Sequence, residues 1–247
     1  MKTVAIQSGD QYTINGSKTF ITNGSYAETL VVMAKTDTTK GTSGISAFVV
    51  DRGAGGISVG RKENKLGMRA SDTVQLIFDD VKVPKENLLG KEGDGFKQAL
   101  EVLDSGRIGI AALSVGLAQG ALDASLKYAK ERQTFGKALA EHQAIQFKLA
   151  DMVVGIEAAR LLTFRAAQAK VNGQPINLVA AQAKYFASEA ALENAIEGMR
   201  IHGAYGYSKE FDIERLYRDA PLTCIGEGTN EMQRIIISKQ WVKRNPA

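Results

Sequence analysis

The spacing of apolar residues changes near Gly93 and divides the chain into two parts. Before this point, short apolar or alternating runs are separated by glycine, asparagine and proline, a pattern typical of β-strands. The clearest strand-like runs are Leu30–Ala34, Ile45–Val50, Val74–Phe78 and Val81–Val83. We therefore predict that residues 1–92 form one domain, a small antiparallel β-barrel or sandwich.

Two Asn-Gly pairs predict turns within this first part. Asn15-Gly16 separates two short alternating runs and indicates a β-hairpin at that position. Asn23-Gly24 follows the second of these runs and indicates another turn.

After Gly93, apolar residues recur every three to four positions, as they do in amphipathic helices. A first helix is expected from a cap at Asp94 to Tyr128, and a second at 141–171, ended by Asn172-Gly173. Three more helices are expected, from Pro175 to about 198–201, at 213–218 and after Thr229. Long helices joined by short loops favour an antiparallel four-helix bundle over residues 93–247. The fold class is therefore α+β.

Composition narrows the function classes. Hydrophobic residues make up 44% of the 247 residues and charged residues 23%, as in ordinary globular proteins. The net charge of +4 is spread along the chain, so nucleic-acid binding is not expected. One cysteine, Cys224, and two histidines leave no disulfide framework or Cys/His metal site. No signal-peptide pattern and no apolar run of membrane-spanning length are evident, and a single cysteine fits a reducing setting, so a cytoplasmic location is expected.

The residue with the strongest chemical interest is Glu227, which stands between Gly226 and Gly228 ahead of the last helix. Glycines on both sides permit backbone conformations that other residues avoid. Thr229 or Asn230 can cap the helix that follows. Taken alone, this stretch is more often an exposed acidic loop, and only the rest of the chain changes that interpretation.

Several other motifs occur in the same order and spacing as in one enzyme family. They are Phe20–Gly24, Leu66–Thr73, Phe78–Pro84, Gly106–Ala111, Glu131–Lys137, Glu141–Gln143, Tyr217–Ala220 and Gly226–Thr229. Together they resemble the acyl-CoA dehydrogenase family, over its middle β-domain and its C-terminal helical domain. That family also has an N-terminal helical domain and a flavin-contacting segment before these regions. We therefore expect the chain to be an N-terminally truncated form with little or no turnover by itself.

The resemblance assigns the chemistry to Glu227. In the family this residue is the base that removes the α-proton of an acyl-CoA thioester, while the β-hydrogen leaves as hydride to FAD. Some relatives carry the base on the first long helix, but the matching residue here is Gly106, which cannot serve. Gly228 matches a position against the thioester, and Asp104 and Arg107 match positions near the thioester and CoA. The motif around Gly106 is most similar to members acting on short or branched chains.

The resemblance also assigns FAD-binding residues. The flavin ring is expected to contact a strand through Phe20, Ile21 and Thr22, and Thr229 and Glu231 are expected to lie near the flavin and its diphosphate. The ADP half is expected to be reached from a neighbouring subunit, through Arg132, Gln133, Thr134, Phe135, Gln143, Arg200, Gly203 and Ala204. Many members have Gln-x-x-Gly-Gly where this chain has Arg200-Ile-His-Gly-Ala204, so Arg200 either contacts the diphosphate or points elsewhere. Each set has a plain structural alternative: a strand end, a helix cap, or a cation near a helix C-terminus.

The resemblance thus implies an FAD-dependent acyl-CoA dehydrogenase that forms a homodimer or homotetramer and passes electrons to an electron-transferring flavoprotein. Two alternatives stay open. One is a non-catalytic helical scaffold that retains the fold and the subunit contacts, and the other is an acyl-CoA oxidase. His202 is expected to be a packed residue at a helix end.

Overall fold

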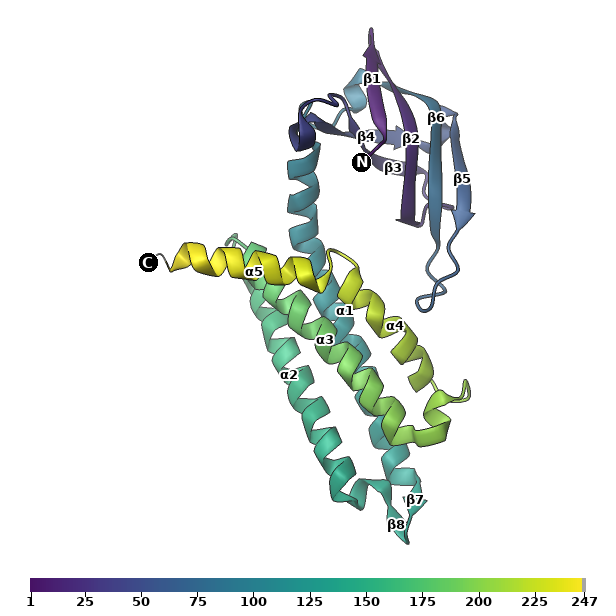
Figure 1. The fold of residues 1–247 in the computed structure, drawn as a ribbon, viewed down its shortest axis with the longest axis vertical. Helices are drawn as coiled ribbons and strands as arrows, with labels where there is room; N and C mark the ends of the chain where they lie inside the picture. The colour runs from purple at the N-terminus through teal and green to yellow at the C-terminus, as the bar shows by residue number, and fades with distance from the viewer. Residues whose placement is uncertain (246–247) are drawn as a thin grey trace. The chain divides into compact units, whose positions relative to one another are not determined.

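The computed structural model describes residues 1–245, and the chain divides into two compact units at residues 102 and 103 (Figure 1). The first unit contains a six-stranded sheet with the order β4-β3-β1-β2-β6-β5. Its strands are β1 Val4–Ser8, β2 Gln11–Thr22, β3 Thr29–Lys35, β4 Ile45–Asp51, β5 Ile57–Lys62 and β6 Thr73–Pro84. Short 3-10 turns occur at Gly41–Gly44, Arg52–Ala54 and Lys85–Asn87.

The sheet is antiparallel, as expected, except where β1 meets β3. These two strands pair in parallel through Val4 and Lys35. The exception arises because β2 turns back along one edge of β1, and the chain then returns along the other edge as β3. The core of this unit is apolar, and Tyr12, Ile14, Phe48, Val74 and Leu76 are among its most buried side chains.

The predicted hairpin at Asn15-Gly16 is wrong. β2 continues through these residues, and its pairing with β6 shifts register between Ile14 and Gly16, which is a β-bulge. Gly16 has φ +138°, and a Cβ at this position would lie 2.8 Å from the Cα of Thr3. The glycine therefore permits a close backbone approach inside a strand, while the turn between β1 and β2 lies at Gly9-Asp10.

The second unit is a helical bundle, and consecutive helices run in opposite directions through α1, α2, α3 and α4 (Figure 1). Its helices are α1 Gly95–Glu131, which begins in the first unit, α2 Gln143–Val171, α3 Asn177–His202, α4 Ile213–Ile225 and α5 Asn230–Arg244. A short hairpin of β7 Gln133–Thr134 and β8 Lys137–Ala138 joins α1 to α2, with 3-10 turns at Leu139–Glu141 and Gly203–Tyr207. The helix α3 packs against α2, α4 and α5, and its many alanines are buried.

Several elements differ from the sequence-based expectation. β1, β5 and the β7–β8 hairpin were not anticipated, and α4 continues through Pro221 to Ile225 instead of ending at Arg218. The helix α1 is also long and apolar enough, by length and composition, to cross a membrane. Residues such as Ala111, Ala118 and Leu122 are nevertheless buried in the bundle, as in the core helix of a folded domain. The domain boundary at residues 92 and 93 stays a prediction.

Candidate active site and cofactor-binding surfaces

Glu227 lies in the loop that joins the end of α4 to the start of α5. The N–H of Gly226 donates to the carbonyl of Leu222 at 2.8 Å and closes the last turn of α4. Thr229 caps α5 by accepting from the N–H of Met232 at 3.4 Å, as one of the two sequence alternatives expected. Between these two caps the backbone is left-handed, with φ +54° at Glu227 and +88° at Gly228. A left-handed glutamate is strained, and such strain persists only where surrounding contacts hold it.

The side chain of Glu227 points toward α1. A Cβ placed on Gly106 would lie 2.5 Å from Oε2 of Glu227 and 3.0 Å from its Cδ. Any larger residue at position 106 would displace this carboxylate, so the two positions are complementary. Gly106 therefore leaves the space that the carboxylate of Glu227 occupies.

The loop is held from below by two buried side chains that sequence reasoning missed. Lys184 on α3 donates to the carbonyls of Cys224 at 3.1 Å and Gly228 at 2.9 Å, and to Oδ1 of Asn230 at 2.8 Å. Gln233 on α5 donates to the same Gly228 carbonyl at 2.8 Å. Both side chains are 0% exposed. The burial of Lys184 could have been predicted from its position on the same helix face as Ala180, Ala187 and Ala191.

Burial shapes the titration of this region. The pKa of Lys184 is lowered to about 8, mainly by burial and also by the nearby Arg107, while Cys224, Glu189 and Glu231 act in the opposite direction. Burial likewise raises the pKa of the Cys224 thiol, which fits its expected role as an inert small side chain.

Asp104 and Arg107, the candidate substrate residues on α1, form an ion pair with each other. Asp104 also accepts from Nδ2 of Asn177 at 2.9 Å. Arg107 is buried, and its Nε has no hydrogen-bond partner among residues 1–245. The ion pair gives both residues a structural role, and their contact with a thioester or CoA stays a prediction.

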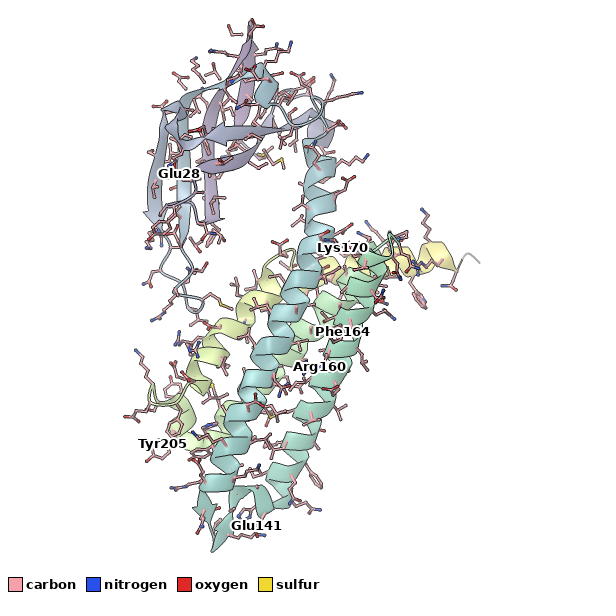
Figure 2. All side chains as sticks on the ribbon, turned by 180° about the vertical axis from the view of Figure 1, so that it is seen from behind. Glu28, Glu141, Arg160, Phe164, Lys170 and Tyr205 are labelled. Carbon is pink, nitrogen blue, oxygen red and sulfur yellow. The ribbon has the colours of Figure 1, made fainter. Side chains whose placement is uncertain are left out.

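The two segments expected at the ADP half of FAD meet at the other end of the bundle. A cavity of about 280 Å³ is lined by residues of both segments. Among its lining residues are Arg132, Thr134, Gly203, Ala204 and Tyr205. Tyr205 and Glu141 mark this end of the bundle in Figure 2, and in Figure 1 it lies opposite the loop between α4 and α5.

Side chains around this cavity are strongly exposed. Phe135 is 98% exposed and has φ +52°, and Arg132, Gln133 and Gln143 are exposed as well. Thr134 is held by His142, whose Nε2 lies 3.2 Å from Oγ1 of the threonine.

Two residues near the end of α3, Arg200 and His202, have protein contacts of their own, and His202 also lines the cavity. Arg200 forms an ion pair with Glu197 on its own helix and is not among the residues that line the cavity, and both sequence alternatives for it stay predictions. His202 is buried, stacks on Tyr128 with ring centroids 4.4 Å apart, and lies with Nδ1 2.7 Å from the carbonyl of Gly198. It is the packed helix-end residue that was expected.

The third candidate surface belongs to the first unit. Phe20, Ile21 and Thr22 end β2, and Phe20 is 69% exposed with φ +55°. The turn that follows is held by Asp72, which accepts from the N–H of Ser25 at 2.9 Å. Among the described residues, six non-glycine residues have positive φ, and Phe20, Phe135 and Glu227 are three of them. Backbone strain therefore gathers at residues that the sequence assigned to the site.

Two family models match the chain. The model described as "Acyl-CoA dehydrogenase, middle domain" matches residues 1–81, and "Acyl-CoA dehydrogenase, C-terminal domain" matches residues 93–242.

A curated relative from Clostridium acetobutylicum, "Acyl-CoA dehydrogenase, short-chain specific", is 49% identical over 96% of this chain. Another, "Caffeyl-CoA reductase-Etf complex subunit CarC" of Acetobacterium woodii, is 48% identical over 99% of it. The chain spans 62% and 64% of the lengths of these relatives.

Solved structures show the same similarity. The butyryl-CoA dehydrogenase of Megasphaera elsdenii superposes with a TM-score of 0.96 at 48% identity, over 98% of this chain and 63% of that one. A chain solved in work on the electron-transferring flavoprotein of Acidaminococcus fermentans superposes with a TM-score of 0.97 at 50% identity, over 98% of this chain and 64% of that one.

Proposed function

The chain belongs to the acyl-CoA dehydrogenase family, and we propose that it forms the part of an FAD-dependent enzyme that desaturates an acyl-CoA thioester between its α and β carbons. The observation that carries this proposal is the left-handed Glu227, which is held between two capped helices with its carboxylate against Gly106. A free acidic loop residue needs neither the strained backbone nor the matching glycine. This observation also favours an enzyme over a non-catalytic scaffold.

The chemistry explains why a fixed carboxylate is needed. A C–H bond next to a thioester is a weak acid, so the base must be held against it and the carbonyl oxygen must be polarised. The Glu227 carboxylate takes the α-proton. Within residues 1–245, the backbone N–H groups of Glu227 and Gly228 donate to no protein acceptor, so they are available to a thioester oxygen. Bound FAD supplies the acceptor for the β-hydrogen, which leaves as hydride.

The residues present fit FAD. A permanent guanidinium at Arg132 and the cavity shared with Gly203 and Ala204 suit a diphosphate and its adenosine. The exposed Phe135 offers an aromatic face, and Phe20 and Thr22 offer an aromatic face and a hydroxyl at the end of β2. Glu231 lies in the first turn of α5, beside the cap Thr229.

The acyl chain is proposed to be short or branched. Relatives of similar identity are named short-chain specific in Clostridium acetobutylicum and Megasphaera elsdenii. Electron-transferring flavoprotein is the proposed acceptor, because relatives of similar identity come from complexes or studies named for that protein. The proposed location is cytoplasmic, or the mitochondrial matrix in a eukaryote, as the name of the rat relative indicates for that protein.

A homodimer or homotetramer is proposed from the positions of the two ends of the site. Gly106, beside the base, and Arg132 lie 26 positions apart on or just after one helix, which corresponds to about 39 Å. The two ends of one bundle therefore serve different flavins, and each FAD needs a second copy. An exposed apolar stripe on α2 offers a surface for further pairing. It comprises Phe147, Val154, Leu161 and Phe164, the last of which is labelled in Figure 2.

The proposal is tested by the reductive half-reaction. The chain, placed behind the N-terminal helical domain of a relative, is loaded with FAD and mixed anaerobically with thioesters of different length. Loss of the flavin absorbance with butyryl-CoA, faster than with octanoyl-CoA, is the expected result. Protein that takes up FAD and is reduced by no acyl-CoA would contradict the proposed function. Rapid reoxidation by oxygen would identify an oxidase instead.

The oligomeric state has its own measurement. Light scattering at micromolar concentration should give the mass of a dimer or a tetramer. A monomer would contradict the assembly and the shared FAD site together.

A further inference from the structure

Lys184 is a buried cation whose contacts all converge on the catalytic loop. Its three donors meet three acceptors, and none of them is a carboxylate. A buried lysine without a charged partner is costly, because its ammonium leaves water without an opposite charge in return. The presence of this costly buried lysine in the middle of the alanine-rich helix α3 therefore needs a functional explanation.

The three acceptors belong to different parts of the loop. Cys224 is in the last turn of α4, where carbonyl groups have no partner within the helix. Gly228 follows the base directly, and Asn230 is the first residue of α5. One ammonium therefore ties the end of α4, the loop and the start of α5 to α3.

Gln233 completes the arrangement from the other side. Its Nε2 shares the Gly228 carbonyl with Lys184, and a Cβ on Gly228 would lie 2.9 Å from that nitrogen. The peptide between Gly228 and Thr229 is thus fixed by two donors, and Nε2 of Gln233 also lies 3.5 Å from the carbonyl of Glu227. These contacts restrict the left-handed backbone of Glu227 and Gly228, which an unconstrained loop would not retain.

We propose that Lys184 is a positioning residue, which holds the Gly228 carbonyl and thereby the backbone of Glu227 in the conformation that aims the base. This inference rests on the proposed function, because only there is Glu227 the catalytic base. The effect of Lys184 on the loop can nevertheless be measured without FAD or substrate.

The protonation state of Lys184 makes its hold on the loop between α4 and α5 depend on pH. The charged groups that face it are Arg107 from α1, Glu189 from α3 and Glu231 from α5, with the Cys224 thiol from α4. A neutral amine has two donors instead of three, so one acceptor of the loop loses its partner. The low pKa of Lys184 places this change just above neutral pH, where the neutral amine is also relieved of the cost of a buried charge. This relief is the larger effect, so closing of the loop over Lys184 becomes more favourable as pH rises.

The test is hydrogen exchange of the whole 247-residue chain, read separately for the segment 224–231 and for α2. In Lys184→Met the loop segment should exchange about tenfold faster or more, while α2 changes little, because buried acceptors lose their donor. The matched control is Ser188→Ala, which removes a buried hydroxyl one turn along α3 that contacts Asn230 and not the loop carbonyls. It should leave the exchange of residues 226–228 within about twofold of the wild type.

The wild-type chain provides a measurement that does not depend on a variant folding. Opening that exposes Lys184 restores its ordinary pKa, so between pH 8 and 10.5 opening takes up a proton and becomes less favourable as pH rises. After correction for the intrinsic rate, the loop segment should therefore open on the order of tenfold less at pH 9.5 than at pH 7, while α2 does not change in this way. Loop exchange that is unaltered by Lys184→Met, or flat across this pH range in the wild type, would overturn the proposal. Failure of FAD uptake with these exchange results intact would instead contradict only the proposed function.

Discussion

The two ends of the helical bundle are built in opposite ways. At one end, the Glu227 loop is held by buried donors on α3 and α5, and every strained residue has a contact that explains it. At the other end, Phe135 is strained and almost fully exposed, and Arg132 lies beside a cavity with its side chain exposed. The loop at the first end is held in place by residues of the same chain, whereas the second end has the composition of a surface that binds a ligand and a second copy.

This difference predicts which substitutions act on chemistry and which act on cofactor binding. Changes at the loop should alter turnover with little effect on FAD. Changes at the exposed end should alter FAD affinity and leave the folded chain as it is.

Gly106→Ala should have the largest effect of the substitutions that leave Glu227 in place. The new Cβ would displace the carboxylate of Glu227, and a displacement of about 1 Å is expected to lower turnover by about 100-fold. Stability should change by less than about 1 kcal/mol, because alanine favours the helix and the displaced atom ends a flexible side chain. The measurements are steady-state turnover and thermal unfolding.

Gly109→Ala is the matched control for that experiment. Gly109 lies on the same helix, and a Cβ there would meet no atom within 4 Å. The same gain in helix propensity should appear without loss of turnover. Equal turnover in both variants would show that Glu227 does not depend on the space at position 106.

Arg132→Ala tests the exposed end. If Arg132 neutralises the diphosphate, FAD binding should weaken by about 2–3 kcal/mol, with helicity unchanged. Calorimetric titration with FAD measures this, and Lys130→Ala, an exposed cation two residues earlier, is the control. Unaltered FAD affinity in Arg132→Ala would return the residue to the role of a cation at the end of α1.

The smallest effect concerns stability against pH. The folded pKa of Lys184, about 8, lies below its ordinary value of 10.5, so between these values the unfolded chain binds a proton that the folded chain does not. The free energy of unfolding contributed by Lys184 therefore rises with pH, by at most about 1.4 kcal/mol per pH unit. Tyr12, whose pKa is raised to about 12, and Cys224 act in the opposite direction.

Comparing the wild type with Lys184→Met cancels those other contributions. Denaturant titrations at pH 7, 8, 9 and 10 should show the wild type gaining stability relative to the variant above pH 8. A difference that is constant across this range would mean that the buried lysine keeps its proton.

The sequence predicted the elements that follow from the periodic spacing of apolar residues, and it did not predict the features that depend on tertiary packing. The long helices α1, α2 and α3 follow from apolar spacing, and the cap at Thr229 follows from residue type. Asn15-Gly16 misled because a bulge and a hairpin turn use the same residues, and only the pairing of β2 with both neighbours decides between them.

The candidate site shows the same division. Glu227 was found from its motif, but its left-handed backbone and the space at Gly106 appear only in three dimensions. Lys184 lies 43 positions before the base and was missed because a charged residue in a helix normally indicates a solvent-facing position.

The account depends most on Glu227 acting as the base, and one measurement tests this directly. With the chain placed behind the N-terminal helical domain of a relative, the rate of flavin reduction by butyryl-CoA is compared between the wild type and Glu227→Gln. The amide keeps the shape of the side chain and loses the base, so the rate should fall by about 10²–10⁴-fold while FAD stays bound. A Glu227→Gln rate close to that of the wild type would contradict the account and place the base elsewhere.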